Sequence, residues 1–266
     1  MHEPEPAALD AGPRSRPLLA SWLATLGANA YLVAGGVVFG VAAIVASWIP
    51  PRRRFVFPVA RAWARGLLLA SGVAVRVART ASLPSSVVFM ANHQSLYDIA
   101  VMLVSVPVPI RFLAKRSLFR IPVFGWALGA AGFVPIDRVD RSRAREAFQL
   151  ALDTLEGGVA IVIYPEETRS LDGRIRPFRR GGFLMALKAH APIVPVGIRG
   201  TLRVRPKGRF LVEPAQVEVA FGDPIDGARW GVRRIDGLIE QVEEEVVRLA
   251  QARRADAVET LSEPVE

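Results

Sequence analysis

Apolar residues follow two different patterns along the chain, and the pattern changes near residue 83. Residues 17–51 contain no charged side chain, and residues 18–49 form a nearly continuous apolar run. A helix needs about 20 apolar residues to cross the hydrocarbon core of a bilayer. This run is long enough to cross with tilt, or to enter the membrane and bend at Gly35 and Gly36. It is too long for a signal peptide. We therefore expect a membrane-associated helix here, with a buried helix of a soluble protein as the alternative.

A second helix is predicted after the first one ends at Pro50 and Pro51. Three consecutive arginines, residues 52–54, follow the prolines, and the pattern then predicts a helix over residues 57–80. On such a helix four arginines would fall within about 60° of one another, because each residue turns the helix by about 100°. They are Arg61, Arg65, Arg76 and Arg79. This face would lie at the level of the lipid headgroups, although a solvated charged face is the simpler alternative.

From residue 83 onward, short apolar runs alternate with helical segments. The runs at 87–90, 111–114, 133–136, 159–164, 193–198 and 217–221 are typical of buried strands. Residues 143–155, 182–189 and 235–250 have the pattern of helices. This alternation predicts an α/β fold with a mostly parallel or mixed sheet flanked by helices. The expected layout is a flexible tail (1–16), a helical membrane-anchoring segment (17–82), the α/β domain with its C-terminal helix (83–254) and a disordered tail (255–266).

The basic charge is concentrated beside the apolar region. The chain has a net charge of +9, and residues 11–97 contain nine arginines and no acidic residue. Such a block favours an anionic membrane surface as partner rather than nucleic acid, for which no recognisable binding motif is present. The arginines at 52–54 place that flank in the cytoplasm, so we expect a cytoplasmic-membrane protein whose α/β domain faces the cytoplasm. Arg14 and Arg16 make the other flank basic too, so a monotopic anchor and a single span both remain open.

Only three histidines can serve as a base, and His93 has the most informative surroundings. His2 is in the N-terminal tail, and His190 stands at a predicted helix end. His93 follows a predicted strand and precedes Asp98 by five residues. It therefore lies at the carboxyl end of a strand, where α/β proteins usually place their functional sites. A histidine oriented by a carboxylate can take a proton from a hydroxyl. The pair can meet only if His93 lies before the helix that carries Asp98, because residues five apart in a helix do not face each other. This spacing alone is common by chance.

Other strand ends carry arginines that could converge on a phosphate, which the guanidinium group binds in a bidentate way. Arg138 follows the strand at 133–136, and Arg169 follows the strand at 159–164. Arg179 lies beside two glycines at a predicted helix start. Each of these arginines, taken singly, could equally be a surface ion-pair partner.

Several other chemistries find no support in the sequence. The chain has no cysteine, which excludes disulfides and a thiol nucleophile. It also has neither a G-x-S-x-G elbow nor a P-loop. No metal site is predicted, since His93 has no second histidine nearby.

Taken in order, four segments resemble the blocks of the 1-acylglycerol-3-phosphate acyltransferase family. They are residues 92–98 (N-H-x4-D), 132–138 (G-x-x-x-I-D-R), 164–170 (Y-P-E-E-T-R-S) and 193–196 (I-V-P-V). The stretch from Lys115 to Trp126 is also similar to that family. The likeness covers about residues 83–222. It departs from the family at Glu167, where glycine is usual, and at Tyr164, where phenylalanine is usual.

The resemblance implies transfer of a fatty acyl group to the sn-2 hydroxyl of a lysophospholipid, 1-acylglycerol-3-phosphate. His93 would be the base and Asp98 its orienting partner, while Arg138, Glu166, Arg169 and Arg179 would hold the glycerol phosphate. No cofactor is implied, and the acyl donor would be acyl-CoA or acyl carrier protein. Because Glu167 replaces glycine, another lysolipid or glycolipid acceptor remains an alternative. A non-catalytic membrane adaptor is a further alternative, which has no need of His93 and Asp98.

Overall fold

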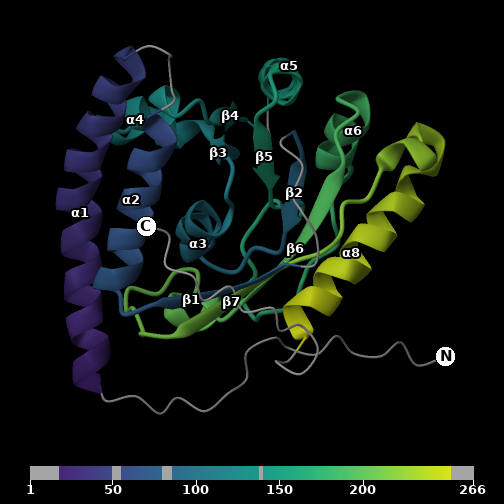
Figure 1. Cartoon of the computed structure of the whole chain (residues 1–266). Coiled ribbons are helices and arrows are strands. Elements are labelled where there is room, and N and C mark those ends of the chain that lie inside the picture. Colours follow the sequence, from purple (N-terminus) through teal and green to yellow (C-terminus); the bar gives the residue numbers. More distant parts are fainter. Residues whose placement is uncertain (1–17, 50–54, 80–85, 138–139, 253–266) are drawn as a thin grey trace.

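A seven-stranded sheet with helices on both faces forms the centre of the molecule (Figure 1). The computed structural model describes residues 18–49, 55–79, 86–137 and 140–252. For Arg79 and Arg141 it describes the backbone only. The two expected tails and the arginines at 52–54 lie outside these residues. The strands are β1 (Ala74–Arg79), β2 (Val88–Ala91), β3 (Ile110–Lys115), β4 (Val134–Ile136), β5 (Ala160–Ile163), β6 (Ile193–Arg199) and β7 (Gln216–Phe221).

The sheet is mixed, with parallel pairing at every described neighbour except one. Its order is β1-β7-β6-β2-β5-β3-β4, and only β6 and β7 are antiparallel. The six strands expected from the apolar runs are confirmed, each within one or two residues at its ends. Because β2, β3, β4, β5 and β6 run in one direction, their carboxyl ends meet along one edge of the sheet. Polar residues that follow these strands are thereby brought together.

Alternate side chains of the central strands feed two separate cores. Phe89 and Ala91 of β2 join the core under α1 (Leu18–Trp48), α2 (Val56–Ala70) and α3 (Tyr97–Ser105). Val88 and Met90 join the opposite core, under α5 (Arg141–Glu156), α6 (Arg180–Lys188) and α8 (Ile235–Gln251). The expected α/β fold with flanking helices is therefore confirmed. The described residues also include α4 (Phe124–Ala130), α7 (Thr201–Val204) and three short 3-10 helices, η1 (Arg116–Arg120), η2 (Gly227–Arg229) and η3 (Val232–Arg234).

The apolar N-terminal run forms one continuous helix, α1, without a break at Gly35 and Gly36. At 1.5 Å per residue its 31 residues extend about 46 Å. Small side chains such as Ala24, Ala28 and Ala43 face the protein, whereas large ones such as Leu23 and Val38 are exposed. The helix is long and apolar enough to cross a membrane, and only 22% of its most apolar window is buried. An apolar face of this size needs a nonaqueous partner.

The expected helix over residues 57–80 is wrong beyond Ala70. The chain turns at Ser71 and Gly72, where the glycine has φ +63°, and then enters strand β1. In β1, exposed Arg76 lies between the partly buried Val75 and Val77, the alternation with a period of two that is typical of a strand with one face on the core. Arg76 stands opposite Glu218 of β7. A shared arginine face with Arg61 is therefore excluded, and residues 74–79 belong to the sheet.

Arg61 also does not lie on a lipid-facing surface. Its Nη2 atom donates to the carbonyl oxygen of Val104 at 2.9 Å, near the carboxyl end of α3. A cation is favourable at this end of a helix because the unpaired carbonyl groups carry partial negative charge. Arg61 therefore joins α2 to α3.

Candidate active site

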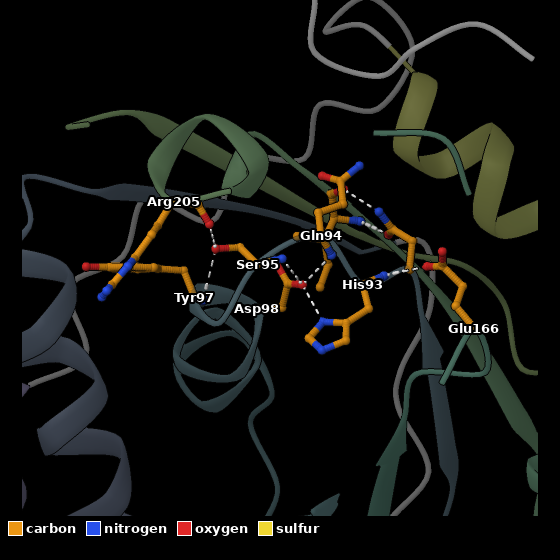
Figure 2. Close-up of polar contacts among 9 residues, drawn as sticks. His93, Gln94, Ser95, Tyr97, Asp98, Glu166 and Arg205 are labelled. Carbon is orange, nitrogen blue, oxygen red and sulfur yellow. Dashed lines mark hydrogen bonds and ion pairs between the residues drawn. The ribbon is translucent and has the colours of Figure 1, made fainter. Parts of the chain in front are cut away.

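His93 and Asp98 form a direct hydrogen-bonded pair at the carboxyl end of β2 (Figure 2). The Nδ1 atom of His93 lies 2.7 Å from Oδ2 of Asp98. α3 begins only at Tyr97, so His93 precedes the helix and Asp98 occupies its first turn. This confirms the condition on which the pairing depended. The carboxylate of Asp98 is fully buried, whereas the ring of His93 is 16% exposed and lines a cavity.

The loop between β2 and α3 is folded around the carboxylate of Asp98. Its Oδ2 atom also accepts hydrogen bonds from the backbone N–H groups of Gln94, at 2.7 Å, and Ser95, at 2.9 Å. Because this oxygen accepts from these N–H groups and faces Nδ1 of His93, the arrangement favours the imidazole tautomer with its proton on Nδ1. In Figure 2 the other ring nitrogen, Nε2, points away from Asp98. This nitrogen is free to act as a base.

The ring of His93 is held on its flat side by Tyr164. The two rings are stacked with centroids 4.1 Å apart and planes 16° from parallel. Burial raises the pKa of Tyr164 well above its usual range, and the nearby charge of Asp98 raises it further. Tyr164 therefore stays neutral and acts as an aromatic wall. From the sequence, Tyr164 was notable only because phenylalanine is usual at this position in the family that the chain resembles.

Glu166 bonds to the backbone beneath His93 rather than facing the cavity. Its Oε1 accepts from the N–H of His93 at 2.7 Å, and its Oε2 accepts from the N–H of Arg176 at 2.9 Å. Only 4% of the residue is exposed. Burial raises the pKa of Glu166 to about 7, although the two hydrogen bonds act in the opposite direction. The contacts make Glu166 a positioning residue for His93, which differs from the expected contact with the glycerol phosphate.

Asn92 fixes the start of the same loop. Its side-chain amide donates to the carbonyl oxygen of Ile198 at 2.8 Å and accepts from the N–H of the same residue at 2.7 Å. This pair of bonds ties the end of β2 to β6. Asn92 therefore holds the start of the loop that carries His93 through the neighbouring strand.

A single cavity of about 1130 Å³ extends from His93 to the N-terminal helices. One part is lined by apolar residues of α1, α2 and α4, including Phe39, Trp63 and Phe124. The other part is strongly basic. Its cations are Lys115, Arg116, Arg120, Arg169, Arg179, Arg205 and Lys207, and its acidic residues are Asp137 and Glu167. An apolar region beside a basic one suits a molecule with a hydrocarbon chain and an anionic headgroup.

Two of the four expected headgroup ligands, Arg169 and Arg179, are thus found in the cavity, and Arg138 lies outside the described residues. Burial lowers the pKa of Arg169, an effect opposed by Asp98 and reinforced by Arg205. Arg205 and Lys207 were missed by the sequence analysis. They follow β6, and the Oγ of Ser95 donates to the Arg205 carbonyl at 2.7 Å. No motif marks them, because only the position of β6 beside β2 brings them to the site.

Comparison with known proteins agrees with this geometry. Residues 74–199 match the model of the family described as acyltransferase. Residues 74–199 are therefore an acyltransferase-family domain. A chloroplastic 1-acyl-sn-glycerol-3-phosphate acyltransferase of Brassica napus is 33% identical over 182 residues, which are 67% of this chain and 52% of that protein. The 1-acyl-sn-glycerol-3-phosphate acyltransferase of Pseudomonas aeruginosa is 27% identical over 80% of this chain and 84% of its own.

Among solved structures, the present chain is similar to the 1-acyl-sn-glycerophosphate acyltransferase PlsC from Thermotoga maritima. The TM-score is 0.75 and the sequence identity 26%, over 90% of this chain and 99% of the other. In contrast, the chain spans about half the length of the first plant relatives it matches. The family match begins at Ala74, the first residue of β1, in agreement with the place of that strand in the sheet.

Proposed function

We propose that this protein transfers a fatty acyl group from an acyl thioester to the sn-2 hydroxyl of 1-acylglycerol-3-phosphate, forming phosphatidate. The single observation that carries the proposal is the His93–Asp98 pair, which faces a cavity lined by apolar side chains and by several cations. The names of the relatives support the same choice of acceptor. A membrane adaptor would need neither an oriented base nor a basic cavity.

The chemistry follows from the free nitrogen of His93. Its Nε2 takes the proton of the acceptor hydroxyl as the hydroxyl oxygen attacks the thioester carbon. The resulting tetrahedral intermediate collapses with cleavage of the carbon–sulfur bond, and the proton on His93 passes to the departing sulfur. Asp98 stabilises the transient imidazolium. No acyl-enzyme is formed and no cofactor is needed, with acyl-CoA or acyl carrier protein as the co-substrate.

The basic part of the cavity would hold the glycerol phosphate. Arg169 and Arg179 take this role together with Arg205 and Lys207. Several cations around one phosphate neutralise its charge and fix its distance from the base. Arg138 remains a proposed ligand on the strength of the sequence.

The contacts of α1 support monotopic attachment to the cytoplasmic membrane rather than a span. Near one end of α1, the hydroxyl of Thr25 accepts from the N–H of Val212 at 2.8 Å. Near the other end, Ala43 and Ala46 pack with Val56, and Ala127 packs against this cluster. Protein contacts thus extend over about 30 Å of the helix, which is the thickness of a bilayer core. A spanning α1 would draw the attached domain into the hydrocarbon, so we place α1 along one leaflet with its large apolar side chains in lipid.

One observation favours a different acceptor as a second candidate. Glu167 has φ +59°, a conformation that costs a side-chain-bearing residue about 1 kcal/mol or more. It also adds a carboxylate to the basic part of the cavity. A negative charge there would oppose a dianionic phosphate and favour a headgroup with an amine, such as a lyso-ornithine lipid. Strained residues persist where function maintains them.

The proposed function is tested with an acceptor panel. The purified full-length chain is assayed with lysophosphatidate, a lyso-ornithine lipid and a glycolipid acceptor, each with acyl-CoA and with acyl carrier protein as donor. We expect the highest kcat/KM with lysophosphatidate, and rescue of a strain deficient in lysophosphatidate acyltransferase. Failure of rescue, with clear transfer to another lysolipid, would reject lysophosphatidate as the acceptor and leave acyl transfer in place.

The same panel tests Glu167 directly. In Glu167→Gly and Glu167→Gln, the KM for lysophosphatidate should fall by about 5- to 30-fold, the change expected when 1–2 kcal/mol of charge repulsion is removed. The glutamine variant keeps the strained backbone and is the matched control, so only the glycine variant should also gain thermal stability. If neither variant changes the KM for lysophosphatidate relative to the KM for the other acceptors, Glu167 does not select the headgroup.

A further inference from the structure

The segment from η1 to α4 exposes a group of large apolar side chains that the proposed reaction does not use. Ile121 is 46% exposed and Trp126 is 61% exposed, and neither lines the cavity around His93. Phe124, between them, is 37% exposed. We refer to residues 115–126 as the η1–α4 hairpin. An exposed apolar cluster on a protein of this size marks a contact surface.

The η1–α4 hairpin holds these side chains outward by a strained turn. Val123 has φ +61° and ψ −55°, and the N–H of Phe124 donates to the carbonyl oxygen of Pro122 at 2.6 Å. These values describe a γ-turn of the rare, strained kind. A β-branched residue with positive φ is a genuine outlier. Such strain is maintained where it serves a function, and here it fixes the apolar cluster on the outside of the domain.

Close packing makes the hairpin a rigid platform. A Cβ atom on Gly125 would stand 2.3 Å from the carbonyl oxygen of Phe119, so only glycine lets the start of α4 approach η1 this closely. The N–H of Gly125 also donates to the carbonyl oxygen of Ile121 at 2.7 Å. The apolar cluster is therefore preformed and does not depend on a partner to fold.

The charge around the cluster identifies the chemistry of its partner. Between Asp98 and Asp137 the sequence has no acidic residue and four basic ones, Arg111, Lys115, Arg116 and Arg120. Arg111 bonds to Thr154, and Arg116 lies 4.0 Å from Glu146, a loose ion pair. Lys115 and Arg120 are exposed on the hairpin. Apolar side chains flanked by cations suit the headgroup region of an anionic membrane, where aromatic rings and basic groups both bind.

The position of the hairpin continues the lipid-facing surface of α1. α4 packs against the carboxyl-terminal half of α1, with Val123 and Ala127 beside Gly40. Large exposed side chains of that half of α1 include Val41, Val45 and Trp48. In Figure 1, α4 lies beside the end of α1, whereas α8 is at the opposite side of the molecule. The two apolar surfaces are adjacent and can meet one membrane.

We propose that the η1–α4 hairpin is a second membrane contact, which inserts Ile121 and Trp126 into the headgroup region of an anionic leaflet while Lys115 and Arg120 bind lipid phosphates. The hairpin then fixes the rotation of the domain about α1. Phe124 and Arg120 also line the cavity, so the contact brings the lipid surface to the site. This inference holds for any lysolipid acceptor.

The absence of cysteine from the chain allows a direct test with single-cysteine variants. Ile121→Cys and Trp126→Cys report on the hairpin, and Val38→Cys reports on α1. Val232→Cys is the matched control, because Val232 is 65% exposed and lies in η3, next to α8. Each full-length variant carries an NBD fluorophore and is bound to vesicles of phosphatidylglycerol and phosphatidylcholine that contain lipids with a doxyl quencher high on the acyl chain.

We expect quenching at positions 121 and 126 to exceed that at position 232 by at least about twofold, and to weaken in vesicles of phosphatidylcholine alone. Quenching at position 38 shows that the protein is bound. If position 38 is quenched while both hairpin positions remain at the level of position 232, α1 alone contacts the membrane and the proposal is overturned. Equal quenching of the hairpin positions in both kinds of vesicle would overturn the role assigned to the anionic lipid.

Discussion

His93→Ala is expected to lower turnover by about 10²- to 10⁴-fold or more, the range for loss of a general base. The fold should survive, because the ring of His93 lies at the cavity wall and its structural bonds come from the backbone. Its N–H donates to Glu166, and its carbonyl oxygen accepts from the N–H of Ser170 at 2.8 Å. Alanine keeps both bonds. The measurement is kcat with purified protein, beside circular dichroism and vesicle binding.

The control for this variant is His190→Ala. His190 is exposed in the turn after α6. Its backbone N–H donates to the carbonyl oxygen of Leu187, a bond that alanine also makes. Turnover of this control should be unchanged. Near-normal turnover of folded His93→Ala protein would show that proton removal by His93 is not part of the mechanism.

Asp98→Asn is expected to lower kcat by about 10²-fold or more while leaving KM for both substrates nearly unchanged. An asparagine can place its oxygen where Oδ2 of Asp98 now accepts from Gln94 and Ser95, so the loop is retained. What is lost is the negative charge that stabilises the imidazolium. Asp98→Ala is a poorer test, because two buried N–H groups would lose their acceptor at a cost of about 1–3 kcal/mol each.

The split between kcat and KM separates orientation of the base from binding of substrate. A rise in KM with unchanged kcat would place Asp98 among the substrate ligands instead. Arg169→Gln provides the opposite pattern for comparison, since Arg169 lines the basic part of the cavity. Its main effect should be on KM for the acceptor.

Local patterns were sufficient to predict most of the sheet and the reactive pair. Runs such as residues 160–163 and 193–199 are buried on both faces, so their apolar character is continuous and easily recognised. The His93–Asp98 pair was also predictable, because the end of a strand is adjacent to the helix that follows it. These features depend on a few neighbouring residues.

The remaining features depend on contacts between distant segments. β1 has only six residues, and its two arginines stand three residues apart, a spacing that places them on one face of a helix. Its place in the sheet is set by β7, which follows it by more than 130 residues. Arg205 reaches the site only because β6 pairs with β2. The side chain of Glu166 likewise points away from the cavity because its carboxylate accepts from backbone N–H groups of two separate loops.

The same contacts change the interpretation of the N-terminal segment. Side chains of α1 and α2, such as Ala28 and Leu67, belong to one core with the sheet. Removal of residues 1–80 would open this core and delete β1, so loss of membrane binding in such a truncation would not isolate the anchor. Substitution of exposed residues of α1 with serine keeps the core intact and tests the anchor alone.

Transfer without an acyl-enzyme is the central claim, and a rapid-quench experiment with purified wild-type protein and radiolabelled acyl thioester tests it most directly. With the thioester alone, we expect no free thiol and no labelled protein. When lysophosphatidate is added, free thiol and labelled phosphatidate should appear together in equal amounts. A burst of thiol with label on the protein before the acceptor is added would contradict the account.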